Sequence, residues 1–343
     1  MNKRALITGI GGQDGAYLAR FLRDKGYDIL GTHLPGKVTN FWRLEYLEVT
    51  NDLQLAELDL RDQMGLDRII RTFQPDEIYN LAAQSYVGSS FAVPVNTLSV
   101  NTVGVAAILE IIRAQNQDIR LFQASSSEIF GNAQEVPQTE QTALQPVNPY
   151  GISKMAAHLL VGSFRSYFDL YTVCGVLFNH ESPLRDSGYV SKKIARTVAE
   201  IKRGRAERLT LGNIHVRRDW GFAGDYVQAM WLALQQSAGD DYLIASGETW
   251  SIKDFVELAF EVVDIHLTWS GEGLNEVARD RRTQKVVVDI SPAFFREVDV
   301  YQTLGLPQKA QDQLGWVPDT DFSELVELMV EYECRQLDNP GMG

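Results

Sequence analysis

The 343-residue chain contains only two cysteines, Cys174 and Cys334, and both stand among apolar neighbours. Such cysteines are typical of reduced thiols rather than of disulfides, which favours a cytoplasmic protein. The five histidines show no spacing that suits a metal, so we expect no metal site. No apolar run approaches 18 residues and the N-terminus has no long apolar leader, so we expect neither a membrane span nor a secretory signal.

Positive charge is also scarce in this chain. Lys and Arg number 32 against 45 Asp and Glu, which gives a formal net charge of −13. We therefore expect no nucleic-acid partner, although local basic clusters can still bind a small anion. With 45% hydrophobic and 22% charged residues, the composition is that of an ordinary globular protein.

Short apolar runs alternate with longer helical patterns through the first two-thirds of the chain. The runs are almost continuously apolar, which is typical of strands that are covered on both faces. Repeated strand–helix units predict an α/β fold with a Rossmann-like doubly wound parallel sheet. We expect strands at 4–9, 28–34, 53–60, 77–83, 119–125 and 171–178, and helices at 14–26, 62–73, 94–115 and 150–168.

The character of the sequence changes in its second half, where basic segments interrupt the alternating pattern. We therefore predict a dinucleotide-binding domain over residues 1–180. A smaller, discontinuous C-terminal domain that binds the substrate is predicted over 181–215 and 251–343. Part of the segment 216–250 is expected to return to the main sheet.

A glycine-rich stretch, TGIGGQDG, follows the first expected strand and opens the first expected helix. Gly9, Gly12 and Gly15 permit a tight turn, let the backbone approach a pyrophosphate and allow the helix to pack closely on the sheet. The free N–H groups at the start of the helix then face the phosphates. In this strand–loop–helix context the motif predicts a dinucleotide cofactor.

The residues after the second strand usually distinguish the two nicotinamide dinucleotides. An acid there binds the ribose hydroxyls of NAD, and an arginine binds the extra phosphate of NADP. This chain has THLPGK, with His33 and Lys37, and meets neither rule. The sequence therefore leaves NAD and NADP open. Asp59, at the end of the third strand, either lies at the adenine edge of the cofactor or caps the next helix.

The segment NPYGISK places Tyr150 four residues before Lys154, so that the two side chains share one helix face. An ammonium near the phenol lowers the pKa of the tyrosine from about 10 and makes it a general acid or base for alcohol–ketone chemistry. The stretch SSSEIFG adds the hydroxyl of Ser126 and the carboxylate of Glu128 after the fifth strand. The alternatives are an ordinary surface pair and a surface carboxylate without catalytic roles.

These segments together resemble the extended short-chain dehydrogenase/reductases that modify nucleotide sugars, and more narrowly the GDP-mannose 4,6-dehydratases. They follow the order of that family over nearly the full length of the chain. The resemblance implies a dehydratase acting on GDP-mannose or a close GDP-hexose or GDP-heptose. It is carried by TGIGGQDGAYLA, EIYNLAAQSYV, FQASSSEIFG, NPYGISK, LFNHESPLR and LGNIHVRRDWGFAGDYVQAMW.

The resemblance also implies a mechanism, that of an NAD(P)-dependent hydro-lyase of deoxysugar biosynthesis. Tyr150, assisted by Lys154, would take the proton of the sugar C4 hydroxyl while hydride passes to the nicotinamide, and Ser126 would polarise the C4 oxygen. Glu128 would then remove the C5 proton, and water would leave from C6. Hydride would finally return to C6 and a proton to C5, so that the tightly bound cofactor is regenerated in each turnover.

The same resemblance assigns binding residues that spacing alone does not reveal. The substrate would be bound by Asn179 and by cations that suit a nucleotide diphosphate: Lys193, Arg218 and Arg296. The cofactor would be bound by Gly9, Gly12, Gln13, Asp14, Gly15, Asp59, Leu60, Leu81, Ala82, Ala83, Ser85, Tyr150, Lys154, His180 and Arg185.

The chain departs from the family pattern at several positions, which leaves the exact sugar open. HLPGK replaces Arg-Arg-Ser after the second strand, Leu184 replaces an arginine, and no proline follows Arg296. Leu306 stands in place of an aspartate, and Asn96 in place of a tyrosine.

Two other functions remain open for this sequence. One is a nucleotide-sugar epimerase or 4-keto reductase with the same fold, against which Glu128 argues. The other is a non-enzymatic dinucleotide-binding module, and the presence of both Tyr150 and Lys154 argues against it.

The expected helices at 94–115 and 150–168 carry more apolar residues than one core-facing stripe needs. In the family that this chain resembles, the corresponding helices pair across a dimer as a four-helix bundle. We therefore expect a homodimer, with a tetramer as the larger alternative. Ordinary packing inside one subunit would also explain the apolar residues.

Overall fold

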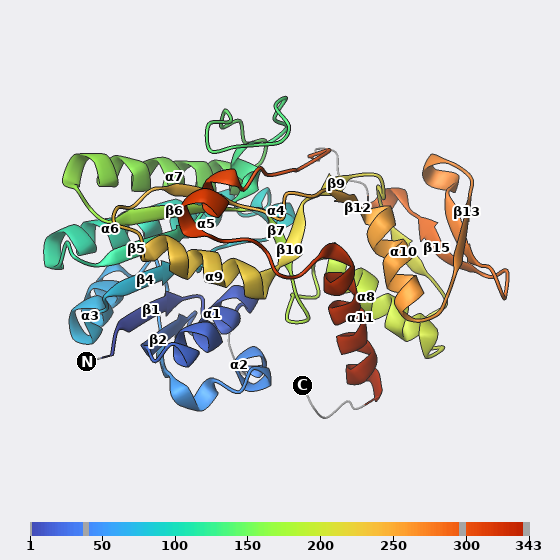
Figure 1. Cartoon of the computed structure of the whole chain (residues 1–343), viewed down its shortest axis with the longest axis horizontal. Coiled ribbons are helices and arrows are strands. Elements are labelled where there is room, and N and C mark those ends of the chain that lie inside the picture. Colours follow the sequence, from blue (N-terminus) through green and yellow to red (C-terminus); the bar gives the residue numbers. More distant parts are fainter. Residues whose placement is uncertain (1, 37–40, 295–299, 339–343) are drawn as a thin grey trace.

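Two lobes lie side by side in the computed structural model, which describes residues 2–36, 41–294 and 300–338 (Figure 1). The larger lobe is built on a seven-stranded sheet in which all neighbouring strands are parallel, so the expected doubly wound α/β fold is confirmed. Across this sheet the order is β3 (Gln54–Glu57), β2 (Asp28–His33), β1 (Arg4–Thr8), β4 (Glu77–Asn80), β5 (Arg120–Ala124), β6 (Thr172–Leu177) and β11 (Asp241–Ile244).

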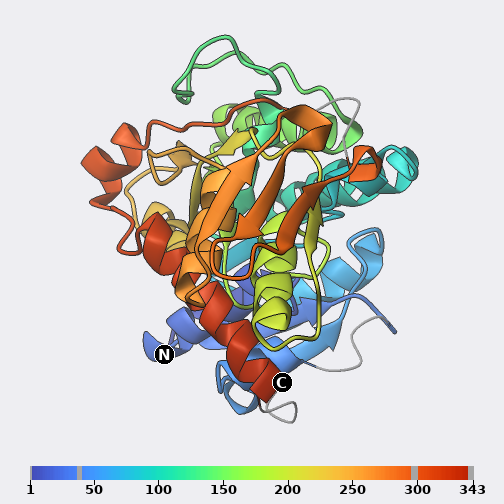
Figure 2. The same cartoon turned by 90° about the vertical axis from the view of Figure 1, so that its right-hand side faces the viewer.

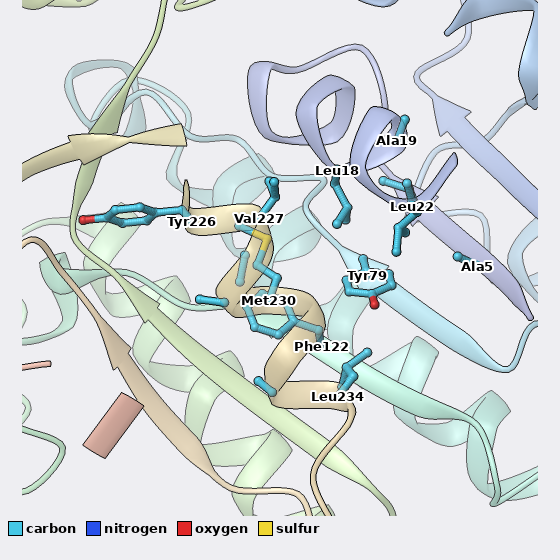
Figure 3. Packing of buried hydrophobic residues seen from close by; sticks show 14 of the residues in the cluster. Ala5, Leu18, Ala19, Leu22, Tyr79, Phe122, Tyr226, Val227, Met230 and Leu234 are labelled. Atoms are coloured by element: carbon cyan, nitrogen blue, oxygen red, sulfur yellow. The ribbon is translucent and has the colours of Figure 1, made fainter. Parts of the chain in front are cut away.

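Helices cover both faces of this sheet, which is why its strands are almost continuously apolar. Successive strand residues point to opposite faces, so Ile7 belongs to one core and Leu6 to the other. Figure 3 shows the first core, where Tyr79 and Phe122 of the sheet lie near Met230. The helices on that face are α1 (Gln13–Asp24), α2 (Trp42–Tyr46) and α9 (Ala223–Leu234), and those on the other are α3 (Gln63–Phe73), α6 (Gly104–Gln115) and α7 (Pro149–Phe168).

The smaller lobe holds a four-stranded sheet and the three helices that share its core (Figure 2). After its first helix and strand the chain returns to the larger lobe as α9 and β11, and only then completes the smaller one. The sheet order is β13 (Leu267–Ser270), β14 (Val277–Asp280), β15 (Val286–Ile290) and β8 (Leu209–Leu211), and the helices are α8 (Val190–Lys202), α10 (Ile252–Val262) and α11 (Phe322–Asp338).

Two small strand pairs connect the lobes. The first is parallel, β7 (Asn179–Glu181) with β10 (Trp220–Phe222), and the second is antiparallel, β9 (Arg217–Arg218) with β12 (Trp250–Ser251). The remaining short elements are α4 (Val87–Ser90), α5 (Pro94–Leu98), η1 (Thr50–Asp52), η2 (Ser99–Val103), η3 (Ser127–Ile129), η4 (Gly273–Asn275), η5 (Pro292–Phe294) and η6 (Ala310–Leu314).

The elements α5, η2 and α6 form one continuous helical stretch, Pro94–Gln115. By length and average composition it is the one stretch among the described residues that could cross a membrane, but it is not a continuous apolar run, since Asn96, Asn101 and Glu110 lie within it. Nearly half of it is buried in the fold, where Val105, Ile108 and Ile112 belong to the core beneath α3 and α7. Core helices of soluble proteins meet the same criterion of length and composition.

Gly175 in β6 tests how tightly the core that contains Phe122 is packed. A Cβ atom at this position would lie 2.3 Å from Cζ of Phe122, whose ring is fully buried and cannot move aside. We expect Gly175→Ala to lower the free energy of unfolding by about 1–3 kcal/mol, measured by urea denaturation.

The matched control is Gly162 in α7, where an added Cβ would meet nothing within 4 Å. Gly162→Ala should raise the free energy of unfolding by about 0.5–1 kcal/mol, because alanine favours a helix more than glycine does. Equal effects of the two substitutions would contradict the tight packing inferred at Gly175.

Candidate active site

The residues predicted to be functional gather at the carboxyl ends of the parallel strands. The strand order reverses between β1 and β4, and in doubly wound sheets ligands bind in the crevice outside such a reversal. The glycine loop follows β1, Leu81 and its neighbours follow β4, and the Ser126–Glu128 segment follows β5. The fold thus brings segments that are far apart in sequence to one edge of the sheet.

The glycine loop lies directly against the end of β4. Gly9 has a φ of +75°, and a Cβ on it would lie 2.9 Å from the Cα of Ala82. A Cβ on Gly15 would lie 2.7 Å from the carbonyl oxygen of Gly9. Helix α1 begins after Gly12 without a side-chain cap, so its first N–H groups are left for a ligand. This narrow backbone cradle fits the pyrophosphate of a dinucleotide.

His180 and Asp14 form an ion pair between β7 and the first turn of α1. Asp14 Oδ2 lies 2.9 Å from His180 Nε2, and His180 Nδ1 lies 2.7 Å from the carbonyl oxygen of Phe178. Both contacts are satisfied when both ring nitrogens carry protons. The ring also stacks on Tyr226, with 4.8 Å between centroids. The side-chain amide of Gln13 donates to the backbone carbonyl of His180 over 2.9 Å, so two adjacent α1 residues hold this strand.

Each partner of this pair stabilises the charged form of the other. Burial by itself would lower the pKa of His180, but the charge and hydrogen bond of Asp14 outweigh it and hold the pKa above its ordinary value. Burial by itself would raise the pKa of Asp14, but the His180 cation holds that pKa below its ordinary value. The glycine-loop end of α1 is therefore attached electrostatically to β7.

Asp59 does not cap the following helix. Asp62 is the cap of α3, because its Oδ1 accepts a hydrogen bond from the Gly65 N–H over 3.0 Å. The carboxylate of Asp59 instead pairs with Arg61, whose Nε lies 2.9 Å from Oδ1, and this pairing holds the pKa of Asp59 below its ordinary value. Arg61 also donates to Asn96 Oδ1 over 3.1 Å. The neighbouring Leu60 is buried.

The catalytic residues predicted from sequence lie together at the end of β5 and the start of α7. Glu128 is half-buried, and its Oε2 accepts a hydrogen bond of 2.8 Å from the side-chain amide of Asn148. Asn148 also caps α7, because its Oδ1 accepts from the Gly151 N–H over 2.8 Å. The Ser126 hydroxyl lies within hydrogen-bonding reach of the Tyr150 phenol. The Glu128 carboxylate, the Tyr150 phenol and the Ser126 hydroxyl therefore lie close together at this edge of the sheet.

The lowered pKa expected for Tyr150 from its pairing with Lys154 is not what the structure shows. Burial raises the pKa of Tyr150, opposed by the Ser126 hydroxyl and more weakly by the Arg185 cation. The Lys154 ammonium lies 5.8 Å from the centre of the Tyr150 ring and donates to the carbonyl of Ala124 over 2.9 Å. Burial also lowers the pKa of Lys154 to about 8. Tyr150 and Lys154 thus share a helix face, but the Lys154 ammonium does not pair with the Tyr150 hydroxyl as expected.

The predicted substrate-binding residues occupy the boundary between the lobes. Asn179 is the first residue of β7, and Arg218 ends β9. Lys193, in the first turns of α8, donates to the carbonyl of Thr210 over 2.7 Å, and burial lowers its pKa. Arg296, like Lys37 of the second-strand loop, lies outside the described residues.

Two residues that contact this site were missed by the sequence analysis. One is Asn148, which a cap signature could have revealed, because Pro149 follows it at the first helical position. The other is Arg43, which donates to the Gly11 carbonyl over 3.0 Å and to the Leu184 carbonyl over 2.7 Å. Through these two hydrogen bonds Arg43 connects the glycine loop to the segment after β7. No local sequence pattern predicts this contact.

No group of three His, Cys, Asp or Glu side chains that could hold a metal ion occurs within the described ranges. Cys174 is fully buried in β6 and Cys334 is half-buried in α11, and both are free thiols.

Comparison with known families gives a match over almost the whole chain. The family described as GDP-mannose 4,6 dehydratase matches residues 6–329. The GDP-mannose 4,6 dehydratase of Drosophila melanogaster is 42% identical over 97% of this chain and 87% of its own length. The enzyme of the same name from Homo sapiens is 42% identical over 96% and 91%, and that of Yersinia enterocolitica 38% over 97% and 94%.

Solved structures with lower identity share the fold. The UDP-glucose 4-epimerase of Bifidobacterium longum, solved with NAD+ and UDP, superposes with a TM-score of 0.82 at 18% identity over 99% of this chain and all of that one. The dTDP-glucose 4,6-dehydratase of Bacillus anthracis, solved with NAD, gives a TM-score of 0.80 at 18% identity over 98% and 97%.

The Asp14–His180 pair should stabilise the fold in a defined pH window. The raised pKa of His180 contributes stability that is complete below its ordinary pKa of 6.5 and is lost as the pH rises through the higher folded value. The lowered pKa of Asp14 contributes stability that is present above 3.8 and is lost as the pH falls through the lower folded value. We expect Asp14→Asn to cost about 2 kcal/mol of unfolding free energy at pH ~5.5, and less at pH ~9, in urea denaturation.

Asp24→Asn is the matched control, since its carboxylate is 56% exposed and pairs with Arg23 on the surface. That variant should differ from the wild type by less than about 0.5 kcal/mol at either pH. If Asp14→Asn also left the unfolding free energy unchanged at the lower pH, the pair would not hold the charges assigned to it.

Proposed function

This chain belongs to the family of GDP-mannose 4,6-dehydratases, and on that basis we propose that it removes water from a GDP-sugar, GDP-mannose or a close hexose or heptose relative. The observation that carries the proposal is the position of Glu128. A carboxylate held beside Tyr150 and Ser126 supplies the second base that dehydration requires. An epimerase or a 4-keto reductase has no need of that base. We further propose that the enzyme acts in the cytoplasm.

The glycine-loop cradle suits NAD or NADP, and such a cofactor would accept a hydride from the sugar and later return it. Gly9, Gly15 and Ala82 let its pyrophosphate approach the backbone, and the N-terminus of α1 stabilises the negative charge. Asp59 and Leu60 follow the end of β3, where the adenine end would bind. In this arrangement the larger lobe holds the cofactor and the smaller lobe contributes to the substrate site.

The phenol of Tyr150 carries the proton exchange at the C4 hydroxyl of the sugar. Because burial raises its pKa, the phenol needs a nearby positive charge and a hydrogen-bond partner to release its proton. Arg185 and Ser126 oppose the effect of burial, and Ser126 is also placed to donate to the C4 oxygen. Lys154 contributes by fixing the end of β5 through the Ala124 carbonyl.

Glu128 removes the proton at C5 once C4 is a ketone, because the adjacent carbonyl makes that proton acidic. Its carboxylate is oriented by the amide of Asn148, which leaves the other oxygen for the substrate. Loss of water across C5 and C6 leaves a double bond there, and the 4-keto-6-deoxy product would form once the hydride is returned to C6 and a proton to C5. We assign the diphosphate to Lys193 and Arg218, because cations at fixed positions match its charge.

Mass spectrometry of a panel of nucleotide sugars, GDP-mannose included, tests the reaction. We expect a product lighter than its substrate by one water, about 18 Da, without net consumption of cofactor. A product of unchanged mass would indicate an epimerase instead, and turnover that consumes reduced cofactor would indicate a reductase. Trials with NAD and NADP would also settle the preference between the two cofactors.

Glu128→Gln should separate the oxidation step from the dehydration step. The amide is isosteric but cannot accept the C5 proton, so we expect loss of water to fall by at least about 100-fold while oxidation at C4 remains. Reduced cofactor should then accumulate and absorb near 340 nm. Full dehydration by this variant would remove Glu128 from its assigned role.

Tyr150→Phe is the matched control for that experiment. It removes the group that exchanges the C4 proton, so neither reduced cofactor nor dehydrated product should form. If both variants gave reduced cofactor, the phenol would not be the residue that acts at C4.

We also propose that two subunits associate through Pro94–Gln115 and α7. Both carry large apolar side chains that remain exposed in one subunit: Val95 is 77% exposed and Val103 53% on the first stretch, and Leu159 is 54% exposed on α7. Pairing these helices across a two-fold axis would bury such residues in a four-helix arrangement. A tetramer would require a further contact.

Leu159→Glu should convert the dimer into monomers, because a charge would have to be buried in the helix interface. Sedimentation velocity would measure the change. Leu274→Glu is the matched control, since Leu274 is 53% exposed but lies in η4 of the smaller lobe. A wild-type chain that sediments as a monomer would refute the proposal.

A further inference from the structure

Tyr189 lies at the boundary of the two lobes, and none of the roles assigned above involves it. It stands immediately before α8, and its phenol hydroxyl lies 3.3 Å from the hydroxyl of Ser85 and 3.4 Å from the Ser85 carbonyl oxygen. Ser85 belongs to the loop after β4 in the larger lobe. The side chain of Tyr189 therefore bridges the segment before α8 and the loop after β4, at the edge where the site residues gather.

The ring of Tyr189 is fixed from two sides. The guanidinium carbon of Arg185 lies 3.5 Å from the ring centre, and the Arg185 Nε is 3.0 Å from Glu181. The ring of Tyr86 contacts its edge at 89°, with 6.0 Å between centroids. The hydroxyl is held less firmly, because its two contacts with Ser85 are long for O–H···O hydrogen bonds. The ring is thus already positioned before a substrate binds. The hydroxyl loses little free energy when it leaves Ser85 for another hydrogen-bond partner.

Tyr189 lies close to residues at both ends of the proposed substrate site. Its phenol is near enough to Tyr150 to influence that group electrostatically. Its backbone carbonyl accepts a hydrogen bond of 2.9 Å from the Lys193 N–H in the first turn of α8, while the Lys193 ammonium donates to the Thr210 carbonyl. Lys193 stands one helical turn after Tyr189 on α8, so a nucleotide sugar that extends from Tyr150 to Lys193 passes the start of that helix, where Tyr189 lies.

We propose that the Tyr189 hydroxyl binds a hydroxyl group of the sugar ring and thereby positions the sugar for reaction at Tyr150. This inference rests on the proposed function. In the free protein the hydroxyl faces Ser85; with substrate it exchanges that weak contact for the sugar, as a phenol can both donate and accept. Tyr189 is therefore a substrate-binding residue that selects the sugar and takes no proton from it.

Tyr189→Phe tests this role, because it removes the hydroxyl and keeps the ring on Arg185. With GDP-mannose, or whichever GDP-sugar of the panel loses water, we expect KM to rise about tenfold while kcat changes by less than about twofold. The inhibition constant of GDP should stay unchanged, because GDP lacks the sugar. The same variant should bind the cofactor and unfold in urea like the wild type.

Tyr167→Phe is the matched control, since Tyr167 is 81% exposed on α7 and its variant should keep the wild-type KM. An unchanged KM in Tyr189→Phe would overturn the inference. So would an equal rise in the inhibition constant of GDP, because Tyr189 would then act by positioning Lys193 rather than by touching the sugar. A wild-type enzyme that loses no water from any nucleotide sugar would instead refute the proposed function itself.

Discussion

The side-chain amide of Asn148 connects the residue assigned to dehydration with the helix that carries the residue assigned to oxidation, and the arrangement of the site depends on it. One end of the amide orients Glu128 and the other caps α7, the helix that carries Tyr150 and Lys154. Asn148 thereby fixes the position of the Glu128 carboxylate relative to the Tyr150 phenol. A cap is worth about 1 kcal/mol in an ordinary helix, but here it also fixes a functional distance.

Two further carboxylates, one half-buried and one fully buried, connect other segments to this site. Asp14, through His180, attaches the glycine-loop helix to β7. Asp219, next to Arg218, is fully buried and accepts backbone hydrogen bonds from Ser246 over 2.7 Å and from Gly305 over 3.1 Å. Burial raises the pKa of Asp219 to about 6, and its N–H donors oppose that effect. Segments far apart in the chain are thus brought to the boundary between the lobes, where the substrate is proposed to bind.

Much of the architecture could be predicted from the sequence, because its signals are local. The glycine spacing between Gly9 and Gly15 needs only a strand, a turn and a helix, and all three are present. The doubly wound sheet follows from continuous apolar strands that alternate with helices. The separation of Tyr150 and Lys154 by four residues correctly placed them on one helix, since helical periodicity is a property of the backbone.

The details of the site could not be predicted in the same way. Whether Lys154 faces the phenol or the Ala124 carbonyl depends on the packing of α7 against β5, which residue spacing does not specify. The raised pKa of Tyr150 arises from burial, a property of the whole fold. The apolar excess of the stretch Pro94–Gln115 was visible in the sequence, but which of its side chains stay exposed depends on the fold.

The sequence by itself determined the class of fold, the cofactor loop and the identity of the chemical groups, because each depends on residues that are close along the chain. Only the tertiary structure decided which of those groups meet. Asp14 finds His180 across 166 residues, and Tyr189 reaches Ser85 across 104. Contacts of that range are set by how strands and helices pack, and short segments of sequence carry no signal of them.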